Sequence, residues 1–165
     1  MNGARVAVTV EEFRGSRSEL LPLFAQADDS PAEINRYIEQ GEMLVARRAQ
    51  QIVGHVQLIP AGDDWEIKSI AVIETLQGQG IGSSLMRGAL ERAFSAGAAC
   101  VLVATATADI SNLRFYQHMG FRMERIERDV FGADRGYPAR LKSDGIPVRD
   151  RVWFSIYAPE RGHVG

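Results

Sequence analysis

Hydrophobic and polar positions follow two different spacings along the chain, and each spacing predicts one kind of element. Segments in which apolar residues alternate with polar ones are typical of strands, and so are short continuous apolar segments bounded by turn residues. Segments in which apolar residues recur every three or four positions, such as Ile81, Leu85 and Ala89, are typical of helices. We therefore predict strands over 5–10, 42–48, 52–59, 65–72, 98–106, 121–127 and 152–157, and helices over 16–26, 31–41, 80–97 and 113–119.

The order of these segments predicts a mixed sheet. One strand and two helices come first, and three strands joined by short turns then indicate an antiparallel meander. The run 98–106 is apolar on both faces, as in a central buried strand. The segment 129–150 has neither spacing, and loops of this length are either functional or disordered. We expect one domain over 1–165, with 160–165 as a frayed tail.

Composition narrows the classes of protein that fit. The chain has 165 residues, 45% of them hydrophobic, which is enough for one full-sized core. Its 19 Lys and Arg against 21 Asp and Glu give a net charge of -2, so no overall field would attract nucleic acid or anionic lipid. The single cysteine excludes a disulfide framework, and no stretch approaches the roughly twenty apolar residues of a membrane helix. We expect a cytoplasmic protein with no nucleic-acid or membrane partner.

A glycine-rich segment, Gln77-Gly78-Gln79-Gly80-Ile81-Gly82-Ser83, lies where a predicted strand gives way to a predicted helix. Such a turn presents unpaired backbone N–H groups and the positive end of the helix dipole, which suits a phosphate or pyrophosphate. A Walker loop is excluded because the chain has no lysine between Lys68 and Lys142. A dinucleotide fingerprint would follow the first strand of a parallel unit, not a meander. The remaining alternative is an irregular turn whose glycines adopt left-handed conformations.

Two motifs in this order resemble those of the GNAT superfamily of acyl-CoA N-acyltransferases. One is Gln-x-x-Gly-x-Gly after the strand end Ile-Ala-Val, and the other is Asn-Leu-Arg-Phe-Tyr-Gln-His-Met-Gly-Phe over 112–121. The resemblance covers most of the chain and implies an α/β (α+β) fold with a mostly antiparallel sheet of about seven strands and about four flanking helices. In that fold the fourth and fifth strands splay apart to admit the pantetheine arm of acetyl-CoA.

The resemblance also implies where acetyl-CoA, the co-substrate, would be held. The main chain of Ile70, Ala71 and Val72 would pair with the pantetheine amides like a further strand, because exposed backbone groups at a splayed strand end need partners. The pyrophosphate would be held by Gln77, Gly78, Gln79, Gly80, Ile81, Gly82 and Ser83.

Two side chains are candidates for catalysis by the same resemblance. Tyr116 matches the tyrosine near the thioester sulfur and would be the general acid for the leaving thiolate; otherwise it only packs among aromatics. Glu66 matches the general base of the histone-acetylating branch and would deprotonate the amine; otherwise it only pairs with Lys68. A strand period of two predicts one shared face for Glu66, Lys68, Ile70 and Val72.

The second motif departs from the superfamily pattern at one position. The superfamily commonly has Asn seven residues before the Tyr, where this chain has Asp109, and Asn112 lies only four residues before it. Either Asn112 reaches the pantetheine from a shifted helix start, which we favour, or Asp109 caps the helix and the contact is absent.

The histidines and Cys100 form no metal-ligand spacing, so we expect no metal. Cys100 lies in an apolar run and is interpreted as a buried small residue, which argues against a cysteinyl acyl-enzyme. We therefore expect direct transfer of the acetyl group to an amine, with a small-molecule primary amine as acceptor and 129–150 beside the acceptor mouth. The alternatives are a protein Nα or lysine amine as acceptor, and a non-catalytic acyl-CoA sensor. The resemblance also allows a homodimer.

Overall fold

The structure is a computed structural model that describes residues 7–160. Within these residues one seven-stranded sheet has the order β1-β2-β3-β4-β5-β9-β6, and β7 and β8 form a separate hairpin. The strands are β1 (Thr9–Glu12), β2 (Glu42–Arg48), β3 (Gln51–Ala61), β4 (Asp64–Val72), β5 (Cys100–Ala106), β6 (Arg122–Glu127), β7 (Lys142–Ser143), β8 (Ile146–Pro147) and β9 (Arg151–Tyr157). Only β4 and β5 pair in parallel in this described sheet, which confirms the predicted mixed, mostly antiparallel sheet.

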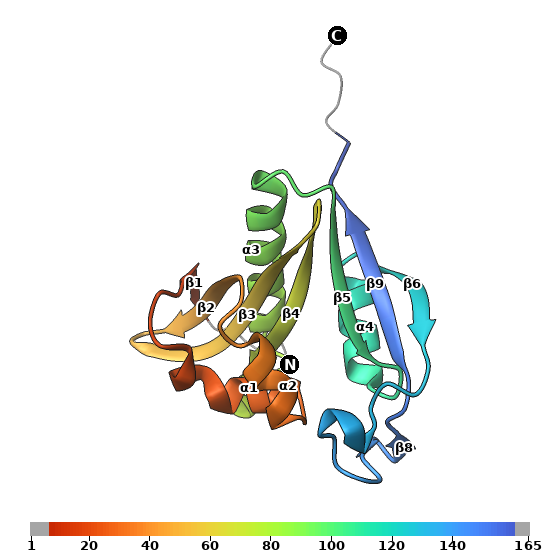
Figure 1. The fold of residues 1–165 in the computed structure, drawn as a ribbon. Coiled ribbons are helices and arrows are strands. Elements are labelled where there is room, and N and C mark those ends of the chain that lie inside the picture. Colours follow the sequence, from red (N-terminus) through yellow and green to blue (C-terminus); the bar gives the residue numbers. More distant parts are fainter. Residues whose placement is uncertain (1–6, 161–165) are drawn as a thin grey trace, which may run out of the picture.

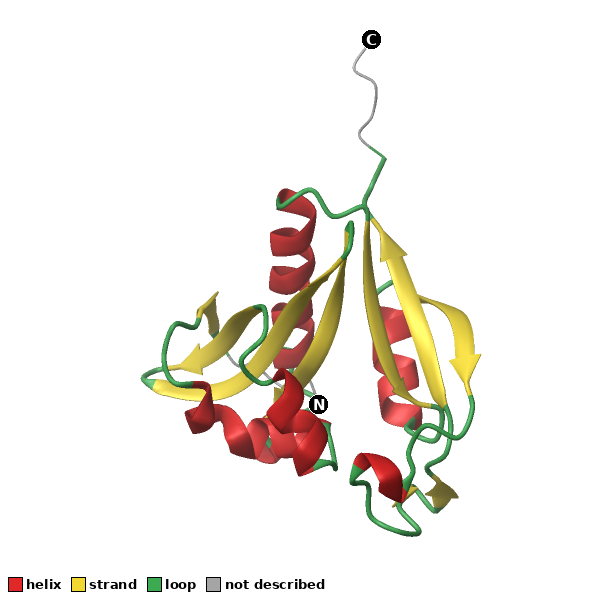
Figure 2. Cartoon of the chain, viewed as in Figure 1, coloured by secondary structure: helices red, strands yellow, loops and turns green. Residues whose placement is uncertain are grey.

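The helices lie on both faces of this sheet (Figure 1). Helices α3 and α4 cover one face, and α1 and α2 cover the other face beside β3 and β4 (Figures 1 and 2). The described helices are α1 (Leu21–Ala27), α2 (Pro31–Tyr37), α3 (Ile81–Ser95) and α4 (Ile110–His118), with 3-10 turns η1 (Arg17–Leu20), η2 (Glu74–Leu76) and η3 (Ala133–Arg135).

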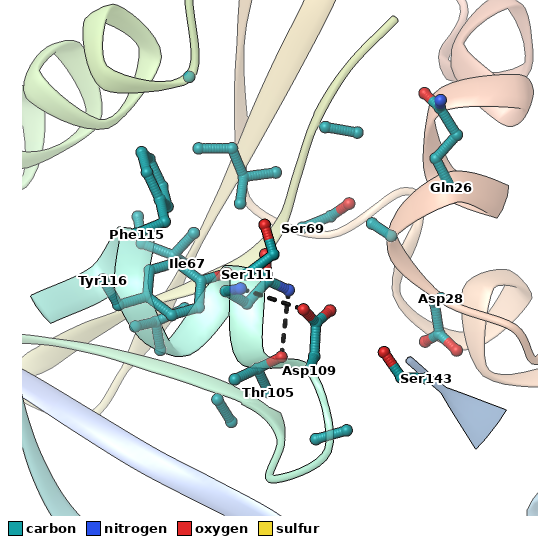
Figure 3. A pocket seen from close by; sticks show the side chains of 18 of the residues that line it. Gln26, Asp28, Ile67, Ser69, Thr105, Asp109, Ser111, Phe115, Tyr116 and Ser143 are labelled. Atoms are coloured by element: carbon teal, nitrogen blue, oxygen red, sulfur yellow. Dashed lines mark hydrogen bonds between the residues drawn. The ribbon is translucent and has the colours of Figure 1, made fainter. Parts of the chain in front are cut away.

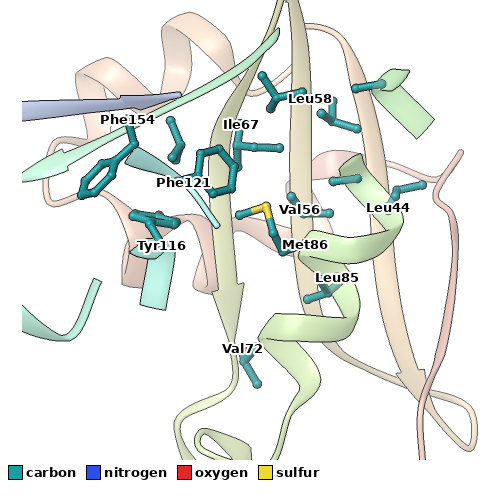
Figure 4. Close-up of a cluster of buried hydrophobic side chains, with 14 of the residues drawn as sticks. Leu44, Val56, Leu58, Ile67, Val72, Leu85, Met86, Tyr116, Phe121 and Phe154 are labelled. Atoms are coloured by element: carbon teal, nitrogen blue, oxygen red, sulfur yellow. The ribbon is translucent and has the colours of Figure 1, made fainter. Parts of the chain in front are cut away.

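Two apolar clusters hold the helices to the sheet. The larger one packs α3 and α4 against one face and includes the fully buried Leu85, Met86 and Phe154 (Figure 4). Helix α3 can approach β3 closely because Gly54 has no side chain; a Cβ there would lie 3.0 Å from Leu85 Cδ1. The smaller cluster packs α1 and α2 against the other face around the fully buried Phe24. Close packing on both faces holds β4 in place where the sheet opens.

Most element boundaries agree with the sequence pattern, and the differences have local causes. Strand β1 runs over Thr9–Glu12 instead of 5–10, and residues 5 and 6 lie outside the described residues. Helix α4 begins at Ile110 instead of 113 because Asp109 accepts a hydrogen bond from the backbone N–H of Asn112 and caps the helix.

Three further segments differ from the pattern. The predicted helix over 16–26 consists of η1 and α1, with a proline in the first turn of α1. The predicted helix over 31–41 ends at Tyr37, where the Arg17 guanidinium donates to the carbonyls of Ile38, Gln40 and Gly41. The segment 129–150 is not a bare loop, because it contains η3 and the β7–β8 hairpin.

The predicted splay between the fourth and fifth strands is confirmed. β4 and β5 pair only between Trp65–Ile67 and Val101–Val103, and no further pairing joins them within the described sheet. Beyond this point their carboxyl ends diverge and leave an opening in the sheet (Figure 2). The segment with η3 and the β7–β8 hairpin lies below this opening in the view of Figure 1.

Candidate active site

The open edge of β4 lies beside the splay. From Ser69 to Val72 the strand pairs with β3 on one side and with no described strand on the other. Ile70, Ala71 and Val72, the residues predicted to pair with pantetheine, all lie on this edge and line one pocket. Backbone groups on an open strand edge can pair with an extended ligand as with another strand.

A β-bulge interrupts β4 at Lys68. Ile67 pairs with Leu58 and Ser69 pairs with Gln57. One step along β3 therefore corresponds to two steps along β4, and Lys68 is the extra residue. Such a bulge bends the strand and changes the face on which later side chains lie. It lies directly after the last residue of β4 that pairs with β5.

The bulge overturns one prediction about β4. Ile70 and Val72 pack in the cluster under α3 and α4, whereas the Lys68 ammonium lies 5.0 Å from the ring centroid of Tyr37, which belongs to the opposite cluster. Glu66 pairs with Lys68 at 3.8 Å. The prediction that all four β4 side chains share one face is therefore wrong, because the extra residue breaks the period of two.

The glycine turn leads from β4 into α3. The Gln77 amide donates to the Val72 carbonyl at 3.1 Å and ties the turn to the end of β4. Gly78 and Gly80 adopt φ values of +75° and +88°, a left-handed region that strongly favours glycine. Gly80 is the N-cap of α3, so no side chain caps the first N–H groups of this helix. These groups and the positive end of the helix dipole can hold a diphosphate.

The structure brings most of the predicted turn residues to one pocket. Gln77, Gly78 and Gly80 line it, as do Ile81, Gly82 and Ser83, whereas Gln79 is not among the lining residues. Gly82 lies beside the Phe115 ring, since a Cβ there would be 3.6 Å from Phe115 Cζ.

Asn112 and Asp109 occupy defined places at the start of α4. Asp109 is the N-cap, and the Asn112 amide donates to Thr105 Oγ1 of β5 at 3.1 Å (Figure 3). Both residues line the pocket. A contact between Asn112 and pantetheine stays a prediction.

Tyr116 lies between the pocket and the core. Its side chain is 3% exposed and packs against Phe115, Phe121 and Phe154, with ring centroids 5.5, 6.0 and 5.6 Å away. Burial raises the pKa of the Tyr116 phenol, followed by a smaller effect of Asp109. The phenol is therefore protonated at neutral pH and can donate to a group in the pocket that it lines.

Glu66 and Lys68 lie on the α1–α2 side of the opening. Both side chains are half-buried and both line the pocket. Because Lys68 also contacts the Tyr37 ring, its ammonium has two partners that hold it beside the carboxylate. The structure therefore places the Glu66 carboxylate at the pocket, where it forms an ion pair with Lys68. The role of Glu66 as a general base stays a prediction.

A buried histidine and serine line the same side of β4. His55 Nε2 and Ser69 Oγ are 2.8 Å apart, and Ser69 lines the pocket. His55 is completely buried against the Phe24 ring, and its Nδ1 has no hydrogen-bond partner within residues 7–160. An unpaired acceptor costs less than an unpaired donor, so Nε2 carries the proton and donates to Ser69. The Ser69 hydroxyl is then free to donate into the pocket.

The segment 129–150 forms the remaining wall. Ser30, the N-cap of α2, accepts from the Glu33 N–H and donates to the Arg135 carbonyl at 2.6 Å, so the segment is tied to α2. Phe131 and Tyr137 form an edge-to-face pair and line the pocket. The sequence pattern gave no signal for Asp28, Tyr37 or Ser69, because they meet the pocket only through long-range packing.

Asp28, at the end of α1, is one of the acidic residues that line the pocket beside this segment, together with Asp29 and Glu33. Its carboxylate accepts from the Tyr37 hydroxyl at 3.1 Å and from the Ser30 N–H at 3.0 Å. Burial raises the pKa of both Tyr37 and Tyr137, and the charge of Asp28 adds to the effect. Both phenols are therefore neutral hydrogen-bond donors beside one carboxylate.

Together these residues line one pocket of about 870 Å³. Figure 3 shows Ser69 of β4, Tyr116 of α4 and Asp28 after α1 around it. Its lining comes from the α3 side of the sheet and from the α1–α2 side, so the pocket passes through the opening between β4 and β5. A long ligand can therefore meet a second reactant that enters from the other face.

No cluster of three or more His, Cys, Asp or Glu side chains within residues 7–160 has a geometry that could hold a metal ion. Among the described helices, none is long and apolar enough to span a membrane.

The fold and the pocket define an acyl-CoA-dependent transferase, and comparisons with known proteins agree. The profile of the Acetyltransferase (GNAT) family matches residues 11–121, and the chain belongs to this family. It is 35% identical over 144 residues to an uncharacterized N-acetyltransferase, YvbK, of Bacillus subtilis strain 168, covering 87% of this chain and 92% of that one.

Solved structures show the same fold. An acetyltransferase of Bacillus subtilis in complex with CoA is 31% identical, with a TM-score of 0.84 over 93% of this chain and 100% of that one. A GNAT family acetyltransferase of Elizabethkingia anophelis with acetyl-CoA bound is 28% identical, with a TM-score of 0.84 over 92% of this chain and 98% of that one. The predicted fold and the predicted enzyme class, an acetyltransferase, are confirmed.

Proposed function

We propose that this protein transfers the acetyl group of acetyl-CoA directly to the primary amine of a small molecule. One observation carries the proposal: a single pocket joins the uncapped N-terminus of α3 on one side of the sheet to Glu66 on the other. The two reactants can thus meet in the opening between β4 and β5. Holding both in a reactive geometry supplies much of the acceleration of such a reaction.

The cofactor would lie along elements that already have free backbone groups. The diphosphate would accept hydrogen bonds from the glycine turn and the first N–H groups of α3, from Gln77 to Ser83. The pantetheine arm would pair with the open edge from Ile70 to Val72, and Asn112 would contact it from α4. Bound CoA in the Bacillus subtilis structure and acetyl-CoA in the Elizabethkingia anophelis structure support this use of the fold.

The chemistry would need three groups of this chain. Glu66 would take a proton from the ammonium, because an alkylammonium with a pKa of about 10.4 is almost wholly unreactive at neutral pH. A backbone N–H of the open edge near Ile70 would stabilise the oxyanion as the amine nitrogen bonds to the thioester carbon. As the carbon–sulfur bond breaks, Tyr116, which lines the pocket, would protonate the leaving thiolate.

The acceptor side of the pocket favours a small molecule over a folded protein. The bond from Ser30 to the Arg135 carbonyl ties 129–150 to α2, and Phe131 and Tyr137 add an aromatic wall. A bound amine would therefore be enclosed by Asp28, Tyr37 and this segment. A protein Nα or lysine amine would have to insert its terminal group past that wall.

Thiol release with a library of small amines, and separately with lysine-containing and free-N-terminal peptides, tests the acceptor class. We expect release with a subset of small amines, and release with peptides alone would overturn this part of the proposal. The role of Glu66 is tested with Glu66→Gln, for which we expect kcat/KM at pH 7 to fall by about 10²–10⁴-fold and to recover in part at high pH. Glu39→Gln, at an exposed site of the chain, is the matched control. An unchanged pH profile for Glu66→Gln would refute the base.

A further inference from the structure

Strand β6 ends the sheet and leaves one edge open. Its inner edge pairs with β9, and no strand within residues 7–160 pairs with its outer edge. Five of its six residues are exposed, and the large apolar side chains of Met123 and Ile126 are 51% and 56% exposed. Open edges of this kind are usually protected, because their free N–H and C=O groups can pair with another chain.

The sequence of β6 is complementary to itself when read in the opposite direction. The strand runs Arg122-Met123-Glu124-Arg125-Ile126-Glu127. If two copies pair antiparallel about a two-fold axis between residues 124 and 125, Arg122 faces Glu127, Met123 faces Ile126, and Glu124 faces Arg125. Each charged residue then meets the opposite charge, and the two exposed apolar residues meet each other.

A bulge in β6 makes this pairing geometrically consistent. The register against β9 shifts between Met123 and Arg125, so Glu124 is the extra residue. Met123 and Ile126 pair with Phe154 and Val152, which both point into the core, and therefore share one face although they are three residues apart. In a regular strand they would lie on opposite faces.

The remaining side chains follow the same rule. Arg122, Arg125 and Glu127 pair with Ser155, Trp153 and Arg151, which alternate with the core residues of β9, so the three share the opposite face. A two-fold axis perpendicular to the sheet keeps each face on its own side, and opposed residues must therefore share a face. With the bulge, both Arg122–Glu127 and Met123–Ile126 satisfy this condition.

We propose that β6 is the contact surface for a second copy of this chain and that the two β6 strands pair antiparallel into one continuous sheet. Charged residues on an edge repel most other strands, but an identical copy in this register meets only opposite charges. The surface is small for a protein interface, so we expect a dimer with a Kd in the micromolar range, about 1–100 μM. The pocket between β4 and β5 lies away from this edge and does not need the partner.

Two single charge reversals test the register in the full-length chain. Glu124→Arg would oppose two arginines across the two-fold axis, and Arg125→Glu would oppose two glutamates. Sedimentation velocity between 5 and 200 μM protein, on the order of the expected Kd, should show the dimer for the wild type and a loss of at least tenfold in affinity for each variant. Glu91→Arg, at an exposed site on α3, is the matched control and should dimerise like the wild type.

Mixing the two variants gives the decisive result. In the mixed dimer both central pairs again join opposite charges, so association should return to within about threefold of the wild-type affinity. Circular dichroism and thiol-release activity of each variant show whether it is folded. A wild type that is monomeric over the whole range overturns the proposal. So does a dimer insensitive to both reversals, or two folded variants that fail to associate on mixing.

Discussion

One buried histidine should make the stability of this protein depend on pH between 7 and 5. His55 is completely buried beside Phe24, with ring centroids 4.4 Å apart, and burial lowers its pKa from 6.5 to about 3. In the unfolded chain the imidazole binds a proton near pH 6.5, whereas in the folded chain it stays neutral until about pH 3. The unfolded state therefore binds more protons in this window, and the free energy of unfolding falls as the pH falls.

The size of this effect follows from the two pKa values. Each pH unit below the unfolded pKa lowers the free energy of unfolding by about 1.4 kcal/mol. Lowering the pH from 7 to 5 should therefore remove about 2 kcal/mol of stability through His55 alone. Carboxylates also titrate at low pH, so the measurement has to compare variants. His55→Gln removes the titration and keeps an amide N–H for the hydrogen bond to Ser69.

Urea unfolding of the wild type and of His55→Gln at pH 7, 6 and 5 checks this prediction. Because the carboxylates are the same in both proteins, their contribution cancels, and the loss between pH 7 and 5 should be smaller by about 2 kcal/mol in the variant. His118→Gln, at an exposed histidine on α4, is the surface control and should follow the wild type. Equal losses for wild type and His55→Gln would refute the reasoning. The same data show how much of the protein is unfolded at each pH. A fall in reaction rate that is caused by acid unfolding can then be distinguished from one caused by protonation of the catalytic base.

Three further changes test the site. Tyr116→Phe should lower kcat by about 10²-fold or more with little change in stability, and an unchanged kcat with a good acceptor would contradict the general acid. Gly80→Ala and Gly62→Ala both add a Cβ in open space at positive φ, so each should lower the free energy of unfolding by about 1 kcal/mol. Calorimetry should show at least tenfold weaker acetyl-CoA binding only for Gly80→Ala. Ser30→Ala removes the hydrogen bond to the Arg135 carbonyl. It should therefore speed amide hydrogen exchange in 129–150 and raise the KM for the amine. Unchanged exchange would contradict the conclusion that this bond holds the segment to α2.

The local pattern of apolar residues was enough to predict most helices and strands, because each of these elements buries one face. The period of Ile81, Leu85, Ala89 and Ala93 predicts α3, and these four residues are buried against the sheet. The glycine spacing around Gly80 likewise indicates a turn into a helix, and the structure has a left-handed Gly80 at the N-cap. Such features depend only on neighbours in the chain, so a single sequence contains them.

What the chain determined by itself is thus the order of its elements, the glycine turn and the family motifs, since these arise from local periodicity and short spacing. The bulge at Lys68, which moves Ile70 to the opposite face from Glu66, arises from the register between β4 and β3. The wall made by Asp28 and the segment 129–150 arises from contacts between distant parts of the chain. Only the tertiary structure decided these features, because pairing register and long-range packing depend on the whole fold and leave no periodic signal in any one segment.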